Sequence, residues 1–179
     1  MDEGVLALRL LIGAVLLAHA AQKSLGWFQG LGLAAMAGAF ESLGLRPGRL
    51  MVLVASVTEA LAALSLLLGL VLPLGAAAAA GTMAVAGAVS TLKAGTFWNA
   101  RGGGEYPFVL AVAAAALAFT GAGSFSADAW LTGAVPVAAP LLGGPGAGFA
   151  AVVLAAVSAG AFLVLLRRRS TAGSTSQSP

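Results

Sequence analysis

The sequence predicts an all-α membrane protein with five transmembrane helices, and two observations lead to this fold class. Of the 179 residues, 60% are hydrophobic and 8% are charged, whereas a soluble domain carries about 25% charged residues. The apolar residues also gather in runs close to the roughly 20 residues that a spanning helix needs. The spans are predicted as helices because a lone strand would leave backbone groups without partners in hydrocarbon.

The predicted spans are the apolar runs with few charged residues. They cover roughly residues 4–22, 50–72, 74–92, 106–121 and 149–166. The sequence from Leu72 to Gly75 predicts a tight turn between the second and third spans. Residues 33–43 have apolar side chains at helical spacing, which predicts a short helix at the membrane interface. The first span is not expected to be a cleaved signal peptide, because it begins with acidic residues and contains Arg9.

Basic residues outside the predicted spans all fall on one side of the membrane. They are Lys23, Arg46, Arg49, Lys93, Arg101 and the triplet Arg167–Arg169, whereas the other side carries Asp2, Glu3 and Asp128. Cytoplasmic loops are enriched in lysine and arginine. The sequence therefore predicts a multi-pass protein of the inner (plasma) membrane with its N-terminus outside and its C-terminus in the cytoplasm. The net charge of +3 reflects this topology, and no nucleic-acid partner is expected.

The rarest residue types limit the chemistry. The chain has no cysteine and one histidine, His19. We therefore expect it to hold no metal site, haem or iron–sulfur cluster by itself. Any redox reaction would depend on a diffusible cofactor or on a partner protein.

Three ionisable residues fall within the predicted spans: Arg9, His19 and Glu59. Each costs at least about 2.5 kcal/mol on insertion scales and so needs a structural or functional reason. Glu59 lies about 13 Å from the inner end of its span, too deep to reach water. It is expected to be protonated or paired with a base on the first helix, either Arg9 or His19. The pair would either fix helix packing or handle protons and ligands.

Other polar residues near the predicted cytoplasmic interface have two interpretations. His19, Gln22 and Lys23 share a face of the first helix. Lys23 either extends to the interface and marks topology or contributes to a site. Glu105 either begins the fourth span, favoured there by the helix dipole, or faces the same interface as His19 and Lys23.

Aromatic residues also gather at this interface. They are Trp27, Phe28, Phe97, Trp98 and Tyr106, whereas the opposite side offers Phe125 and Trp130. An aromatic belt would place tryptophan and tyrosine at this depth. Because a belt would be more even between the two sides, the asymmetry favours a pocket for a flat ring.

Short motifs spread over roughly residues 5–130 resemble the DoxX family. They are Leu8–Leu10 with His19–Lys23, Gly26–Gly30, Phe40–Pro47, Glu59, Asn99 with Gly102–Pro107, and Gly123–Asp128. The resemblance implies a four-helix membrane bundle. It also implies kinship with membrane subunits of quinone-linked oxidoreductases, although most members have no assigned reaction. The fifth span is a departure from the family pattern.

The expected organisation has four parts: a DoxX-like four-helix domain (1–130), a Pro/Gly-rich external loop (131–148), a fifth transmembrane helix with a basic stop (149–169) and a disordered tail (170–179). The four family helices are expected to pack through small residues such as Gly81 and Gly87, with the fifth helix on the outside.

The leading functional hypothesis is a membrane subunit of a quinone-linked oxidoreductase, not a self-contained enzyme. Its predicted acid–base residues are Glu59, His19 and Glu105, and its predicted quinone-binding residues are Arg9, Gln22, Lys23, Trp27, Phe28, Trp98, Asn99 and Tyr106. The expected partners are the lipid bilayer and a soluble or membrane-bound redox subunit. The alternatives are an inactive membrane anchor for a cytoplasmic redox enzyme and, ranked last, a small proton-coupled transporter.

Overall fold

The computed structural model describes residues 2–175, with side chains described as far as Leu166. Its regular elements are helical throughout this part of the chain. They are α1 (Asp2–Ser24), α2 (Gly32–Ser42), α3 (Gly48–Leu68), α4 (Leu72–Ala94), α5 (Glu105–Thr120), α6 (Ala127–Ala134), α7 (Ala139–Leu142) and α8 (Gly144–Thr175), with short 3-10 helices η1 (Asn99–Arg101) and η2 (Pro136–Ala138).

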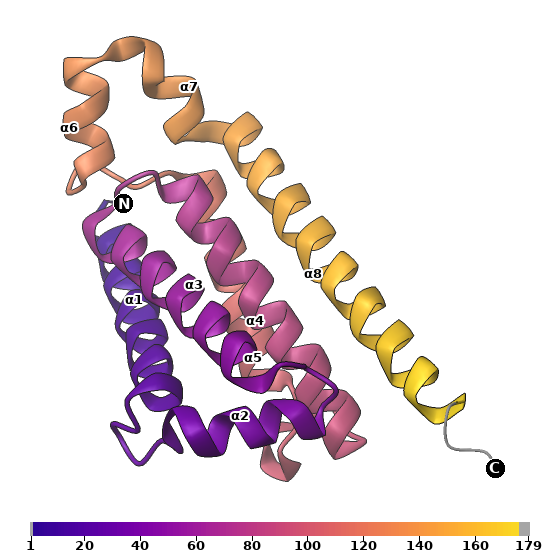
Figure 1. Cartoon of the computed structure of the whole chain (residues 1–179). Helices are drawn as coiled ribbons and strands as arrows, with labels where there is room; N and C mark the ends of the chain where they lie inside the picture. Colours follow the sequence, from indigo (N-terminus) through magenta and orange to yellow (C-terminus); the bar gives the residue numbers. More distant parts are fainter. Residues whose placement is uncertain (1, 176–179) are drawn as a thin grey trace.

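Helices α1, α3, α4 and α5 form a bundle that is closed at its two ends by different elements (Figure 1). Helix α2 lies across one end, called the α2 end below. Helices α6 and α7 lie at the opposite end, called the α6 end. Helix α8 runs beside α4 and packs on α4 and α5, while its C-terminal part diverges from the bundle (Figure 1).

Four helices in the described part of the chain are long and apolar enough to cross a membrane, namely α1, α3, α4 and α8. This confirms the predicted class of all-α membrane protein. The predicted fourth span is the shorter apolar helix α5, with 16 residues. At 1.5 Å per residue it is about 24 Å long, less than the roughly 30 Å of a hydrocarbon core.

The turn between α3 and α4 lies earlier than the sequence predicts. Helix α3 ends at Leu68, and Gly69 adopts the left-handed conformation (φ 63°) that commonly ends a helix. Pro73, expected in the turn, instead lies in the first turn of α4. A proline is tolerated there because the first turn needs no backbone N–H donor.

The segment predicted as a loop over 131–148 is largely helical. It contains the end of α6, η2, α7 and the beginning of α8. Its prolines begin helices: Pro136 opens η2, Pro140 lies in the first turn of α7, and Pro145 lies in the first turn of α8. Helix α8 also starts before residue 149 and continues past 169 to Thr175. The side chains of Arg167–Arg169 and residues 176–179 lie outside the described part.

Small residues let α4 pack closely on its neighbours, as predicted. A Cβ atom added to Gly87 would meet the Phe108 ring at 2.9 Å, and one added to Gly81 would lie 3.5 Å from Ala155 of α8. The α8 side of this contact consists of Ala151, Ala155 and Ala159, which are all buried and four residues apart. Helix α8 therefore packs on α4 along a stripe of alanines.

Candidate functional site

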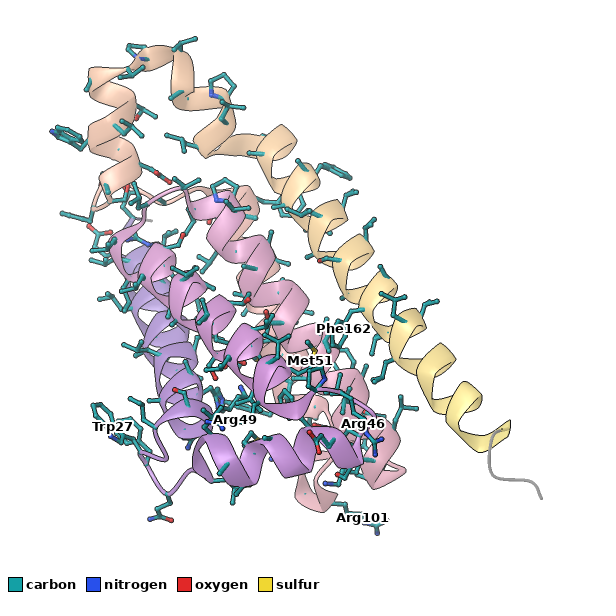
Figure 2. The ribbon with its side chains drawn as sticks, viewed as in Figure 1. Trp27, Arg46, Arg49, Met51, Arg101 and Phe162 are labelled. Atoms are coloured by element: carbon teal, nitrogen blue, oxygen red, sulfur yellow. The ribbon has the colours of Figure 1, made fainter. Side chains whose placement is uncertain are left out.

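A cavity of about 470 Å³ lies between α3, α4 and α8 and reaches α2. Helix α4 forms its floor, because α4 packs on both α3 and α8. The lining is mostly apolar and includes Met51 and Val54 of α3, Val85 and Val89 of α4, Phe40 of α2 and Phe162 of α8. Figure 2 shows Met51 and Phe162 near the space between α3 and α8. The volume is within the roughly 300–1,000 Å³ range of small-molecule sites.

An ion pair forms the polar part of the cavity wall. The Nζ atom of Lys23 donates to both carboxylate oxygens of Glu59, at 2.5 and 2.6 Å. The Glu59 side chain is 1% exposed and the Lys23 side chain is 18% exposed, and both residues line the cavity. The pair thus places an ammonium and a carboxylate beside an apolar space of ligand size.

This pairing corrects the sequence-based expectation for Glu59. Its base is Lys23, from the last turn of α1, and neither Arg9 nor His19. A lysine near the end of a span usually extends to the interface. Here its flexible stem turns inward, because a buried carboxylate without a cation would be far more costly than a lysine held away from water.

Hydroxyl groups add weaker polarity to the same cavity. Thr82 and Ser158 both line it. The Thr82 hydroxyl donates to the Ala78 carbonyl at 2.7 Å, and the Ser158 hydroxyl donates to the Leu154 carbonyl at 2.7 Å. Since each donor is used within its own helix, these oxygens remain available only as acceptors.

Ser56 lies three residues before Glu59 on α3 and is also buried. Its Oγ atom is the buried side-chain atom without a hydrogen-bond partner in the described part of the chain. Residues three apart share a helix face, so this hydroxyl lies on the same side of α3 as the ion pair.

Arg9 occupies a separate site at the α6 end. It is 1% exposed and donates to the carbonyls of Leu66 at 2.9 Å, Leu67 at 3.3 Å and Phe125 at 3.1 Å, and to that of Ala122. The carbonyls in the last turn of a helix have no partner within the helix. Arg9 supplies donors to the end of α3 and ties α1 to the segment after α5. It does not line the cavity.

Asp128 completes this second site, although the sequence predicts no role for it beyond topology and the family motif. It is buried, and its carboxylate accepts from the backbone N–H groups of Val71 at 2.7 Å and Leu72 at 2.9 Å. An acidic group at a helix N-terminus is favoured by the dipole. The signal in the sequence is an isolated acid two residues after a serine that caps a helix, since Ser126 accepts from Ala129 N–H at 3.1 Å.

His19 and Gln22 form a local cluster outside the cavity. The two side chains are 3.1 Å apart (Nδ1 to Oε1), and Gln22 Nε2 donates to the Phe28 carbonyl at 3.2 Å. The His19 ring lies 6.0 Å from the Tyr106 ring. This arrangement joins α1 to α5 and holds the loop after α1, and none of the three residues lines the cavity.

The predicted aromatic residues lie outside the cavity. Trp27, Phe28 and Trp98 are all more than 60% exposed. They form edge-to-face pairs in two separate loops, Trp27 with Phe28 and Phe97 with Trp98, and none of them lines the cavity. Their placement at the α2 end fits the aromatic belt, the other interpretation of the sequence.

Glu105 and Asn99 shape the loop before α5. The Glu105 carboxylate accepts from the Asn99 backbone N–H at 3.1 Å, and the Glu105 N–H donates to the Phe97 carbonyl at 2.9 Å. Neither residue lines the cavity. Of the predicted site residues, the structure therefore brings only Glu59 and Lys23 together at it.

The cavity is also lined by residues that the sequence does not predict as site residues, chiefly Met51, Ser158 and Phe162. They were missed because α8 was expected to pack outside a finished bundle. In the structure α8 supplies one wall of the cavity. The alanines spaced four residues apart indicate which face of α8 packs, but not which helices it contacts, so the sequence does not place Ser158 and Phe162 at a cavity.

Fold and site together define a multi-pass, all-α membrane protein with a ligand-sized cavity in its helical bundle. The DoxX family model matches residues 4–91, from the start of α1 through most of α4. Over these residues the chain belongs to the DoxX family of membrane proteins. No curated protein and no solved structure matches the chain. The matched part contains Lys23, Glu59 and the floor of the cavity, whereas α8 lies beyond it.

Proposed function

We propose that this protein is the membrane subunit of a quinone-linked oxidoreductase and that it binds the quinone in the cavity beside Lys23 and Glu59. The observation that carries the proposal is the buried ion pair on the wall of an otherwise apolar cavity of about 470 Å³. Ligand pockets are typically apolar with a few placed polar groups.

The chemistry of the cavity fits a quinone. A bound quinone supplies two-electron, two-proton redox chemistry. Lys23 has three N–H donors and can hold a carbonyl oxygen while it still contacts Glu59. Glu59 can hold a proton at a carboxylate oxygen or release one, and the apolar walls exclude water and accept an isoprenoid tail. Lys23 also supplies positive charge where negative charge develops on the ring oxygen.

The electrons are proposed to come from a separate redox subunit, since the chain has no cysteine and one histidine. The proposed membrane is the inner membrane, with the α2 end facing the cytoplasm. The exposed basic residues Arg49, Lys93 and Arg101 lie at that end, while Asp2 and Asp128 lie at the α6 end (Figures 1 and 2).

Binding of a quinone analogue to the purified full-length protein tests this proposal. Glu59→Gln removes the charge at the cavity, and Glu105→Gln makes the same change outside it. We expect Glu59→Gln to weaken binding by about tenfold or more, which corresponds to the loss of one charge-assisted contact, and Glu105→Gln to leave binding unchanged. A wild-type protein that does not bind the analogue would overturn the proposal.

A second candidate function is favoured by the basic surface at the α2 end. Arg46, Arg49 and Arg101 are exposed there (Figure 2), and they could dock an acidic cytoplasmic enzyme. In that case the protein would act as an anchor and Glu59 would only stabilise the bundle. Co-purification of a soluble enzyme that survives Glu59→Gln but not charge reversal at these arginines would favour the anchor.

A further inference from the structure

We infer that α8 is the specificity-determining wall of the cavity and that the ligand enters sideways from the bilayer, through the opening between α3 and α8. This inference rests on the proposed quinone site and adds its route of access and the residues that select the ligand. The ligand class is an amphipathic molecule of the lipid phase, with an oxygen-bearing flat ring and an apolar tail.

The first observation is the way the three helices meet. Helix α4 packs on both α3 and α8, whereas α3 and α8 do not pack extensively on each other. The two outer helices therefore border a groove whose floor is α4. The opening between them has Met51 and Val54 on one side and Phe162 on the other.

The second observation is that the groove is covered at the α2 end. Along its floor α8 lies close to α4, where a Cβ atom added to Gly81 would be 3.5 Å from Ala155, and the buried Ala159 lines the cavity. Towards the α2 end, the α2–α3 connection crosses beneath the cavity, where Leu45 is buried. A Cβ atom added to Gly44 would lie 3.6 Å from Leu166 of α8. A ligand from the aqueous side would have to displace this packing, whereas one from the side would not.

The third observation is the chemistry of the rim. Val54 of α3, and Val157 and Leu165 of α8, are exposed apolar residues on the outer surfaces of the two helices. Surfaces of this kind face lipid in a spanning helix. The rim is thus continuous with the lipid-facing surface, and a tailed ligand crosses no polar barrier on its way to the cavity.

The polarity within the cavity fixes the orientation of the ligand. The ion pair lies on the α1–α3 side of the cavity, while Phe162 lies on the α8 side. The ring oxygen therefore points to Lys23 and Glu59, and the tail leaves past Phe162. In this arrangement Phe162 and Ser158 select the ligand by size, and neither belongs to the part of the chain that the family model matches.

The rate at which a short-tailed quinone binds to the full-length protein in lipid nanodiscs tests this inference. Val54→Trp narrows the opening, and the matched control Val57→Trp adds the same bulk to an exposed position of α3 that does not line the cavity. We expect Val54→Trp to slow association by about tenfold or more, within the usual range of mutational effects on association rates. We expect Val57→Trp to have no effect.

A second pair of variants keeps the test independent of one bulky side chain. Because the chain has no cysteine, Met51→Cys with Phe162→Cys can be joined by a short thiol-specific cross-linker, with each single variant treated alike as a control. Joining should slow both association and dissociation of the quinone. Unchanged rates in the joined protein and in Val54→Trp would overturn lateral access but leave the proposed function standing. A wild-type protein that does not bind quinone would instead overturn the proposed function.

Discussion

The two buried charged sites of this bundle differ in how their charges are satisfied. At the α6 end, Arg9 and Asp128 bind backbone groups of three segments, namely the end of α3, the start of α4 and the stretch after α5. In the half nearer α2, the bonds recorded for Lys23 and Glu59 join these two side chains to each other, beside a cavity. Charged side chains whose hydrogen bonds go to backbone groups hold helices together, whereas a charged pair beside a cavity can still form hydrogen bonds to a ligand.

The largest effect is expected from removing Arg9. Arg9→Met leaves carbonyls at the end of α3 and in the segment after α5 without donors, and Asp128 without a nearby cation. We expect the free energy of unfolding to fall by about 4 kcal/mol, as when one partner of a buried charged network is lost. Chemical unfolding in mixed micelles measures this loss. Arg101→Met, at an exposed position, is the control, and equal stability of the two variants would contradict a structural role for Arg9.

A smaller loss is expected from Asp128→Ala. The change removes two charge-assisted hydrogen bonds to the N-terminus of α4, and it should lower the free energy of unfolding by about 3 kcal/mol. Amide hydrogen exchange at Val71 and Leu72 should become faster while exchange at the α2 end stays the same. Uniform acceleration throughout the bundle would argue against a local role at the start of α4.

For the cavity pair we expect an effect on binding larger than the effect on stability. Glu59→Gln should lower the free energy of unfolding by only about 1–2 kcal/mol, because Lys23 is partly exposed and can extend to the interface once it loses its partner. The double variant Glu59→Gln with Lys23→Met should regain most of that stability, since it removes the unpaired charge. Both variants should bind a quinone analogue with lower affinity than the wild type. A double variant that is less stable than Glu59→Gln would indicate that the Lys23–Glu59 pair has a structural role, like the charged residues at the α6 end.

The smallest effect is expected at Ser56. Its hydroxyl is buried without a hydrogen-bond partner in the described part of the chain. Ser56→Ala therefore removes a buried polar atom without breaking a hydrogen bond. We expect a change within about 0.5 kcal/mol, with either no loss or a slight gain. Thermal unfolding of Ser56→Ala against Ser158→Ala, in which a bonded hydroxyl is removed, measures this. A clear loss of stability at Ser56 would indicate a buried partner, such as a bound water.

Much of the fold follows from the sequence, because it depends on local composition. Apolar runs define α1, α3, α4 and α8, and the spacing of apolar residues over 33–43 gives α2. The glycines and alanines of α4 predict its close packing on neighbouring helices. The turn before α4 was misplaced because Pro73 suits both a turn and the first turn of a helix. Local sequence does not separate these two positions.

The site was less predictable, because it depends on how helices rotate and which of them become neighbours. The need of Glu59 for a base follows from the cost of burying a charge. That Glu59 pairs with Lys23 and not with Arg9 does not follow from the sequence. The depth of a residue along a span does not reveal the carbonyl groups to which Arg9 donates. The predicted aromatic pocket rests only on the shared depth of these residues in the membrane. In the structure the aromatic residues of the loops form two separate pairs, Trp27 with Phe28 and Phe97 with Trp98.

The most direct test of the central claim is to find where a quinone binds. A photoreactive quinone, added to the full-length protein in nanodiscs and located by mass spectrometry, should label residues of α3, α4 and α8 around the cavity, such as Val85, Val89 and Phe162. An excess of unmodified quinone should prevent the labelling. Labelling confined to the exposed aromatics Trp27 and Trp98 would contradict the claim that the Lys23–Glu59 cavity is the quinone site.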